Sequence, residues 1–323
     1  MINHPTKKLK AVYLLFAFML FGTIHSMAYN KHALLVGISD YGNTENKPGK
    51  FKNINGAADL QILSPELRKQ GFKITVLKDS KATHKAIISA LNKLITRCNA
   101  GDIVYLHFST HGQLVEDLDG DEPDGWDEAI IPYDAQLTYK KGVYEGQNHL
   151  LDDELSIYIN KIRKKLGADG CLYVVVDACH SGTSSRNVTF EDMMGIPMDP
   201  EEDEGPVRGT PITFSKNGKK FNSDKYRPNN NNDYFRLRQE KGKAPVVFLE
   251  ACRSNEQNTE VRDKHSGKFY GPLTYHIVQT LRHQNISKDM KWVNYVKDSF
   301  ENDRSIQKRS FPQKQHMVIE STN

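Results

Sequence analysis

The chain has 323 residues, with 38% hydrophobic and 26% charged side chains, and this composition predicts that most of it folds. The 44 basic and 40 acidic side chains nearly cancel, and no long basic run lies outside the N-terminus, so we expect no nucleic-acid partner. The four cysteines match neither a dense disulfide framework nor paired metal ligands, although the pairing of Cys98, Cys171 and Cys252 after export stays open.

The first 28 residues have the pattern of a secretory signal peptide. Three lysines within residues 7–10 precede an apolar run over residues 11–22, and small residues precede a candidate cleavage point after Ala28. The alternative is an uncleaved anchor, but the run is shorter than the roughly 20 residues that a spanning helix needs. We expect an exported protein, periplasmic or secreted, whose mature domain (residues 29–323) has no membrane span.

Apolar β-branched runs alternate with helical patterns along the rest of the chain. Strands are predicted over residues 32–37, 72–77, 103–108, 172–176, 246–249 and 315–320. Helices are predicted over residues 57–70, 85–98, 152–166 and 273–283. Strands that are apolar throughout and alternate with helices indicate an α/β fold with a mainly parallel sheet covered on both faces.

Residues 184–243 break this alternation. They contain few apolar side chains, an acidic cluster over residues 199–204 and an asparagine-rich run over residues 229–233. We predict an exposed insertion or linker within the domain, because such a segment cannot bury enough apolar surface to order itself.

Reactive side chains follow the third and fourth predicted strands. His111 comes directly after one strand, and Cys179 after the other. Because the carboxyl ends of parallel strands form the ligand-binding edge of such sheets, the two side chains meet if the strands are neighbours. An imidazole beside a thiol can transfer the protons of a nucleophilic reaction. The backbone N–H groups of Gly112 and Cys179 would then stabilise an oxyanion, at about 3–4 kcal/mol per donor.

Each of these residues has a structural alternative when taken singly. His111 could be a capping histidine, and Cys179 a buried core thiol. The two motifs in this order are more specific than either alone.

The motif sequences resemble the metacaspase and prokaryotic caspase-like cysteine peptidases. The resemblance rests on Ser-Thr-His-Gly-Gln at 109–113, Asp-Gly-Trp-Asp-Glu at 124–128 and Asp-Ala-Cys-His-Ser-Gly at 177–182, and it extends from about residue 32 to 320. The Gln-Ala-Cys signature of true caspases is absent. The resemblance implies a caspase-like αβα sandwich with about six strands, a Cys-His dyad, cleavage of proteins or peptides after Arg or Lys, and a monomer.

Two aspartates are the candidate substrate-binding residues. Asp177 lies two positions before Cys179, on the same face of its strand, and Asp59 matches the family's other pocket aspartate. Carboxylates suit a cationic side chain at P1, the substrate residue before the cleaved bond, and they pair with arginine bidentately. The alternatives are a helix N-terminal carboxylate at Asp59 and a buried strand-end carboxylate at Asp177.

The resemblance implies no required cofactor and leaves Ca²⁺ binding open. Asp127, Asp152 and Asp153 match the ligands of calcium-binding members, but Arg186 stands where those members carry another aspartate. The alternative is a solvated acidic loop with an N-cap at Asp152.

We therefore expect a cysteine endopeptidase specific for basic P1 residues. Self-cleavage inside the exposed insertion has four candidate points: Arg208, Lys219, Lys220 and Arg227. The alternatives are a cysteine transferase or esterase on the same dyad, and a catalytically silent caspase-like binding or scaffold module.

Overall fold

The computed structural model describes residues 29–42, 49–120, 122, 125–179, 204–221, 234–253, 256–307 and 315–322, and the statements below concern these residues. The predicted signal peptide, Arg186 and Arg227 lie outside them. In this part of the chain, no helix combines the length and apolarity that crossing a membrane requires.

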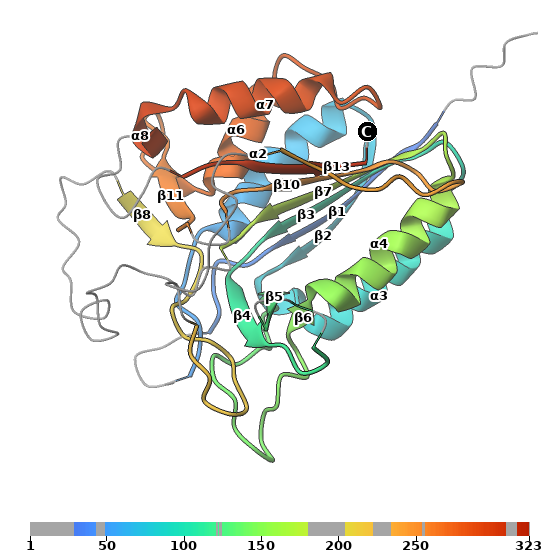
Figure 1. Ribbon diagram of the computed structural model, residues 1–323. Helices are drawn as coiled ribbons and strands as arrows, with labels where there is room; N and C mark the ends of the chain where they lie inside the picture. Colours follow the sequence, from blue (N-terminus) through green and yellow to red (C-terminus); the bar gives the residue numbers. More distant parts are fainter. Residues whose placement is uncertain are drawn as a thin grey trace, which may run out of the picture.

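A seven-stranded sheet forms the centre of the fold (Figure 1). Its spatial order is β2 (Phe72–Lys78), β1 (Lys31–Gly37), β3 (Ile103–Ser109), β7 (Cys171–Asp177), β10 (Val246–Glu250), β13 (Val318–Ser321) and β9 (Tyr234–Arg236). All neighbouring pairs are parallel except β10 with β13. The mainly parallel sheet is therefore confirmed, with one strand more than expected, because β9 arises from the predicted insertion.

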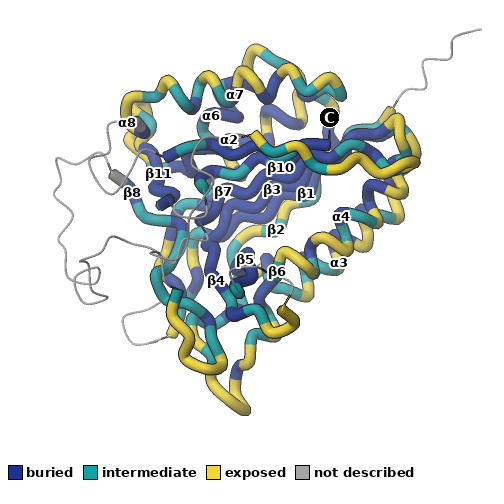
Figure 2. Tube along the Cα trace, viewed as in Figure 1, coloured by how far each residue is buried: buried dark blue, intermediate teal, exposed yellow. Residues whose placement is uncertain are grey.

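Helices cover both faces of the sheet. One face carries α2 (Gly56–Lys69), α6 (Pro272–Leu281) and α7 (Lys291–Glu301), and the other carries α3 (His84–Arg97) and α4 (Asp152–Leu166). A separate hydrophobic cluster lies beneath each helical layer. Figure 2 shows the central strands buried, while exposed residues lie along the outer sides of the helices. This αβα arrangement confirms the predicted fold class.

Two small antiparallel sheets lie near the carboxyl ends of the central strands. One contains β4 (Gly112–Glu116), β5 (Trp126–Ile130) and β6 (Leu150–Leu151), and the other contains β12 (Phe269–Tyr270), β11 (Thr259–Arg262) and β8 (Glu204–Val207). The remaining short helices are η1 (Asp79–Lys81) and α8 (Arg304–Gln307).

The described part of residues 184–243 differs from the exposed linker that its composition suggests. Strands β8 and β9 both belong to it, Arg208 is fully buried, and Phe214 is 3% exposed. A polar segment is ordered at these positions because its backbone joins existing sheets and its two buried side chains enter preformed pockets, as described below.

Candidate active site

The register of the central sheet brings the two candidate catalytic residues to one edge. Strands β3 and β7 are parallel neighbours, and Ser109 is the register partner of Asp177. His111 and Cys179 each follow two residues later, and both are buried. The condition set by the sequence, that the two strands be adjacent, is met.

His111 is held in one orientation by the backbone and by two aromatic rings. Its Nε2 lies 2.8 Å from the carbonyl oxygen of Lys52, which can only accept, so Nε2 carries the hydrogen. Its ring packs against Tyr41 and Phe51, with ring centroids 5.1 and 5.6 Å away. Among the described residues, the buried Nδ1 has no hydrogen-bond partner. Burial lowers the pKa of His111 to about 4, so the imidazole is neutral with a free lone pair on Nδ1.

The candidate oxyanion donors converge on a single carbonyl oxygen. The backbone N–H of Cys179 donates to the carbonyl oxygen of Arg208 at 2.9 Å, and that of Gly112 donates to the same oxygen at 3.2 Å. The Arg208 backbone also lies close enough to His111 to influence its pKa. Two donors and an imidazole therefore surround one peptide carbonyl group.

The Cys179 thiol lies against the peptide that follows this carbonyl. Its Sγ donates to the carbonyl oxygen of Glu256 at 3.0 Å. A Cβ added at Gly209 would lie 3.1 Å from Sγ, so the Gly209 backbone passes directly over the sulfur. All four cysteines are described, and each is a free thiol. The Arg208–Gly209 peptide thus lies across the candidate nucleophile.

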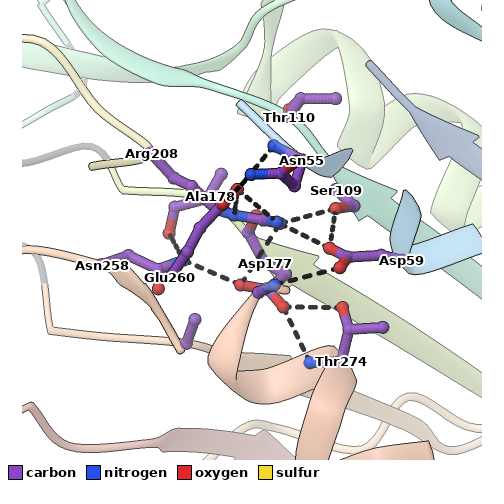
Figure 3. Close-up of polar contacts among 12 residues, drawn as sticks. Asn55, Asp59, Ser109, Thr110, Asp177, Ala178, Arg208, Asn258, Glu260 and Thr274 are labelled. Carbon is purple, nitrogen blue, oxygen red and sulfur yellow. Dashed lines mark hydrogen bonds and ion pairs between the residues drawn. The ribbon is translucent and has the colours of Figure 1, made fainter. Parts of the chain in front are cut away.

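The side chain of Arg208 fills a buried pocket of carboxylates (Figure 3). Its Nη1 lies 2.7 Å from Oδ2 of Asp59 and 3.7 Å from Oδ1 of Asp177. Its Nη2 and Nε donate to Oε1 of Glu260 at 2.8 and 3.1 Å. Nη1 also donates to Oγ of Ser109 at 2.6 Å. Every nitrogen of the guanidinium therefore has a partner.

The pocket carboxylates are themselves held by fixed donors. Asp177 accepts from the backbone N–H of Thr274 at 2.7 Å and from its hydroxyl at 2.6 Å, in the first turn of α6. Asp59 accepts from the backbone N–H of Gly271 at 3.0 Å. A side chain at Gly271 would overlap both the Asp177 carboxylate and the Arg208 guanidinium, so the pocket requires glycine at this position.

Burial and like charges dominate the electrostatics of this pocket. Burial raises the pKa of Asp59 to about 7, despite the opposing effect of Arg208. Burial disfavours the charge of Arg208, but Asp59, Glu260 and Asp177 outweigh this effect and raise the pKa of Arg208. The pocket therefore favours a permanently charged guanidinium over a group that can release its proton.

Sequence reasoning missed two residues of the pocket. Ser109 lies inside the Ser-Thr-His-Gly motif, where its position two residues before His111 places it on the same strand face. Glu260 lies on β11, outside every motif, and no local pattern distinguishes it from a surface glutamate. Only the pairing of β11 with β8 brings it to Arg208.

The candidate calcium residues lie near enough to affect one another's charge, and calcium binding stays a prediction. Burial, followed by the charges of Asp152, Asp117 and Asp153, raises the pKa of Asp127 to about 7. In the described part of the chain, no group of three or more acidic, histidine or cysteine side chains has the geometry to hold a metal ion.

Comparison with known proteins relates the chain to one family of peptidases. The family model "Metacaspase, peptidase C14 domain" matches residues 31–186. Metacaspase-1 of Schizosaccharomyces pombe is 28% identical over 268 residues, covering 76% of this chain and 58% of the relative. Metacaspase-1B of Aspergillus terreus is 31% identical over 163 residues, covering 48% of this chain and 39% of the relative. The chain thus spans between about two fifths and three fifths of the length of these relatives.

A solved structure supports the fold independently. The crystal structure of a Geobacter sulfurreducens protein superposes with a TM-score of 0.53 at 22% identity, covering 90% of this chain and 93% of that one. At this identity, the likeness concerns the fold alone.

Proposed function

The chain belongs to the metacaspase and caspase-like peptidase family, and from this membership we propose that it is a cysteine endopeptidase cleaving proteins or peptides after Arg or Lys. In this proposal, Cys179 is the nucleophile and His111 transfers protons. Gly112 and Cys179 supply the oxyanion donors, and Asp59, Asp177, Ser109 and Glu260 bind the P1 side chain.

One observation carries the proposal: Arg208 of the chain itself has the geometry of a bound substrate residue. Its carbonyl oxygen accepts from the Gly112 and Cys179 N–H groups, and its guanidinium pairs with Asp59 and Glu260. Four polar atoms of one arginine, the carbonyl oxygen and the three guanidinium nitrogens, would not meet these complementary partners by composition alone.

The reaction follows from these contacts. The Cys179 thiol gives its proton to Nδ1 of His111, and the sulfur attacks the carbonyl carbon of the P1 residue. The negative charge that develops on the oxygen is stabilised by the two N–H donors. His111 then protonates the leaving nitrogen, and water hydrolyses the resulting thioester.

The same geometry supports self-processing at one bond. Among the three candidate cleavage points that the structure describes, Arg208 is the one whose carbonyl lies at the oxyanion donors, so we propose cleavage between Arg208 and Gly209. Lys219 instead donates to the carbonyl oxygen of Gly125 and lies over the ring of Trp126, away from the sulfur.

An assay of peptide reporters tests the function. We expect hydrolysis of peptides with Arg or Lys at P1, and covalent labelling of the wild type by an arginyl chloromethyl ketone. The variants Cys179→Ala and His111→Ala should lose both hydrolysis and the 208/209 cut. Full activity in either variant refutes the dyad, and a folded wild type that neither cleaves nor is labelled indicates a silent scaffold module. Running the assay with calcium and with a chelator determines whether the ion matters.

A further inference from the structure

The chain after Arg208 is also held by contacts with the body of the protein. We name residues 210–221 the clamp segment. The backbone N–H of Phe214 donates to the carbonyl oxygen of Leu114 at 2.9 Å, and that of Glu116 donates to the carbonyl oxygen of Phe214 at 2.9 Å. The segment therefore adds to the edge of β4.

A buried aromatic ring fixes the middle of the clamp segment. The ring of Phe214 lies 4.4 Å from that of His149, 5.7 Å from Tyr144 and 5.9 Å from Tyr139, measured between centroids. Gly146 lies against the same ring, and a Cβ there would come 3.1 Å from it. This pocket holds Phe214 five positions beyond Gly209.

Polar contacts extend the anchor on both sides of Phe214. Gln113 donates to the carbonyl oxygen of Ile212 at 2.7 Å, so two residues separate Gly209 from the first of these polar contacts. Glu116 accepts from the Ser215 hydroxyl at 2.6 Å and from the Asn217 backbone N–H at 3.2 Å. None of these contacts involves the bond that is cut, so they survive its cleavage.

This anchoring has a chemical consequence for the self-cleavage proposed above, on which the inference rests. We propose that the clamp segment makes the cut at Arg208–Gly209 reversible, so that the protein catalyses peptide-bond re-formation as well as hydrolysis at this site. Attack by Cys179 breaks the bond between the Arg208 carbonyl carbon and the Gly209 nitrogen, and the thiol proton passes through His111 to that nitrogen. The products are a thioester and a free amine.

The amine stays beside the thioester because its own chain is bound at Ile212 and Phe214. Such tethering gives it a high effective concentration against water. In the return step, the Gly209 amine attacks the thioester carbon, the carbon–nitrogen bond forms, the carbon–sulfur bond breaks, and the proton returns to sulfur. Water completes cleavage only in the fraction of events in which the amine has moved away.

Hydroxylamine separates reversible from irreversible cleavage. If the amine returns, hydroxylamine intercepts the thioester as an Arg208 hydroxamate and accelerates fragment formation in the wild type, on the order of tenfold or more. If the amine does not return, fragments appear at the rate of thioester formation and hydroxylamine changes nothing. The measurement is the rate of the 208/209 cut on denaturing gels, with mass spectrometry of the new C-terminus.

Variants that weaken the binding of the clamp segment, one at Phe214 and one at its partner Glu116, provide the second test. Phe214→Ala should raise the rate of the cut without hydroxylamine and remove most of the hydroxylamine effect. Glu116→Gln, which keeps the shape of the site but weakens its acceptor, should do the same to a smaller extent. Tyr295→Ala, which removes an exposed ring on α7, is the control and should behave as the wild type.

The outcomes distinguish the inference of reversible self-cleavage from the proposed peptidase function. A cut that is insensitive to hydroxylamine in the wild type overturns the inference, and so does an unchanged rate in both clamp variants. In either case, hydrolysis of an Arg reporter by the cut enzyme would leave the proposed function standing. If the wild type and every variant cut neither themselves nor the reporter, both the inference and the proposed function are refuted.

Discussion

The guanidinium of Arg208 and the carboxylate of Glu260 meet edge to edge, with Nε and Nη2 both donating to the same oxygen, Oε1. A lysine side chain has no N–H group at the position of the arginine Nε, so it cannot make both hydrogen bonds to Glu260. This geometry predicts that the pocket binds arginine more tightly than lysine.

The first prediction concerns this selectivity. Glu260→Gln keeps the side-chain shape and removes the charge, so kcat/KM for an Arg reporter should fall by roughly 30- to 100-fold, as expected for one charge-assisted hydrogen bond. The kcat/KM for the matching Lys reporter should fall less, because a lysine side chain makes only part of this contact with Glu260. Glu66→Gln, which changes a buried glutamate of α2 that pairs with Lys69 and not with Arg208, is the control. An unchanged Arg-to-Lys ratio would contradict the role of Glu260.

The second prediction concerns the chain without its own arginine. Arg208→Gln should abolish the 208/209 cut while leaving the catalytic residues intact. It also leaves three buried carboxylates without their cation, and breaking such an arrangement costs about 3–5 kcal/mol in the free energy of unfolding. Denaturant unfolding measures this loss. Lys219→Gln, which removes a cation from an exposed site, should unfold within about 1 kcal/mol of the wild type.

The third prediction follows from the pKa of His111. Burial lowers this pKa to about 4, so the imidazole stays neutral and able to accept a proton throughout the range above that value. The rate of the 208/209 cut should therefore fall on acidification with a midpoint near pH 4, and not near the ordinary value of about 6.5. The experiment is a pH profile of the cut, with the folded state followed in parallel by fluorescence. A midpoint above pH 6 in the folded protein would show that another group controls the step.

The fourth prediction concerns Thr274, which positions Asp177 without contacting Arg208. Thr274→Val removes the hydroxyl that donates to Asp177 at 2.6 Å but keeps the backbone N–H that donates at 2.7 Å. KM for an Arg reporter should rise about tenfold with kcat nearly unchanged, because binding and not proton transfer is affected. Thr274→Ser restores the hydroxyl and should restore KM. A Ser variant as weak as the Val variant would indicate a packing role.

Local patterns predicted the parts of the site that lie on the central sheet. His111 and Cys179 follow buried strands, and the direction of a parallel sheet places such residues at one edge. Asp177 at the end of β7 and Asp59 on α2 both lie beside Arg208, and their role in substrate binding stays a prediction. Hydrophobic periodicity predicted α2, α3, α4, α6 and six strands of the central sheet, but it did not predict α7 or β9.

Long-range pairing explains what the sequence did not reveal. Residues 204–208 are polar and carry no strand pattern, because their order comes from β11 and from the carboxylate pocket and not from a hydrophobic face. Ile212 and Phe214 are followed by a polar run up to Phe221, and two apolar residues are too few to establish a periodicity. The structural roles of Glu260 and Phe214 depend on partners that lie more than 50 residues away in the sequence.

The position of β13 has a consequence for the timing of biosynthesis. This strand inserts between β10 and β9, both of which leave the ribosome before it. The neighbouring Gln315 also donates to Asn258 at 3.0 Å, and Asn258 in turn donates to Asp177 at 2.8 Å. A nascent chain that has not yet reached residue 315 therefore lacks both the strand that joins β10 to β9 and the hydrogen bonds that link Gln315 to Asp177, so we expect the pocket to be completed only at the end of synthesis.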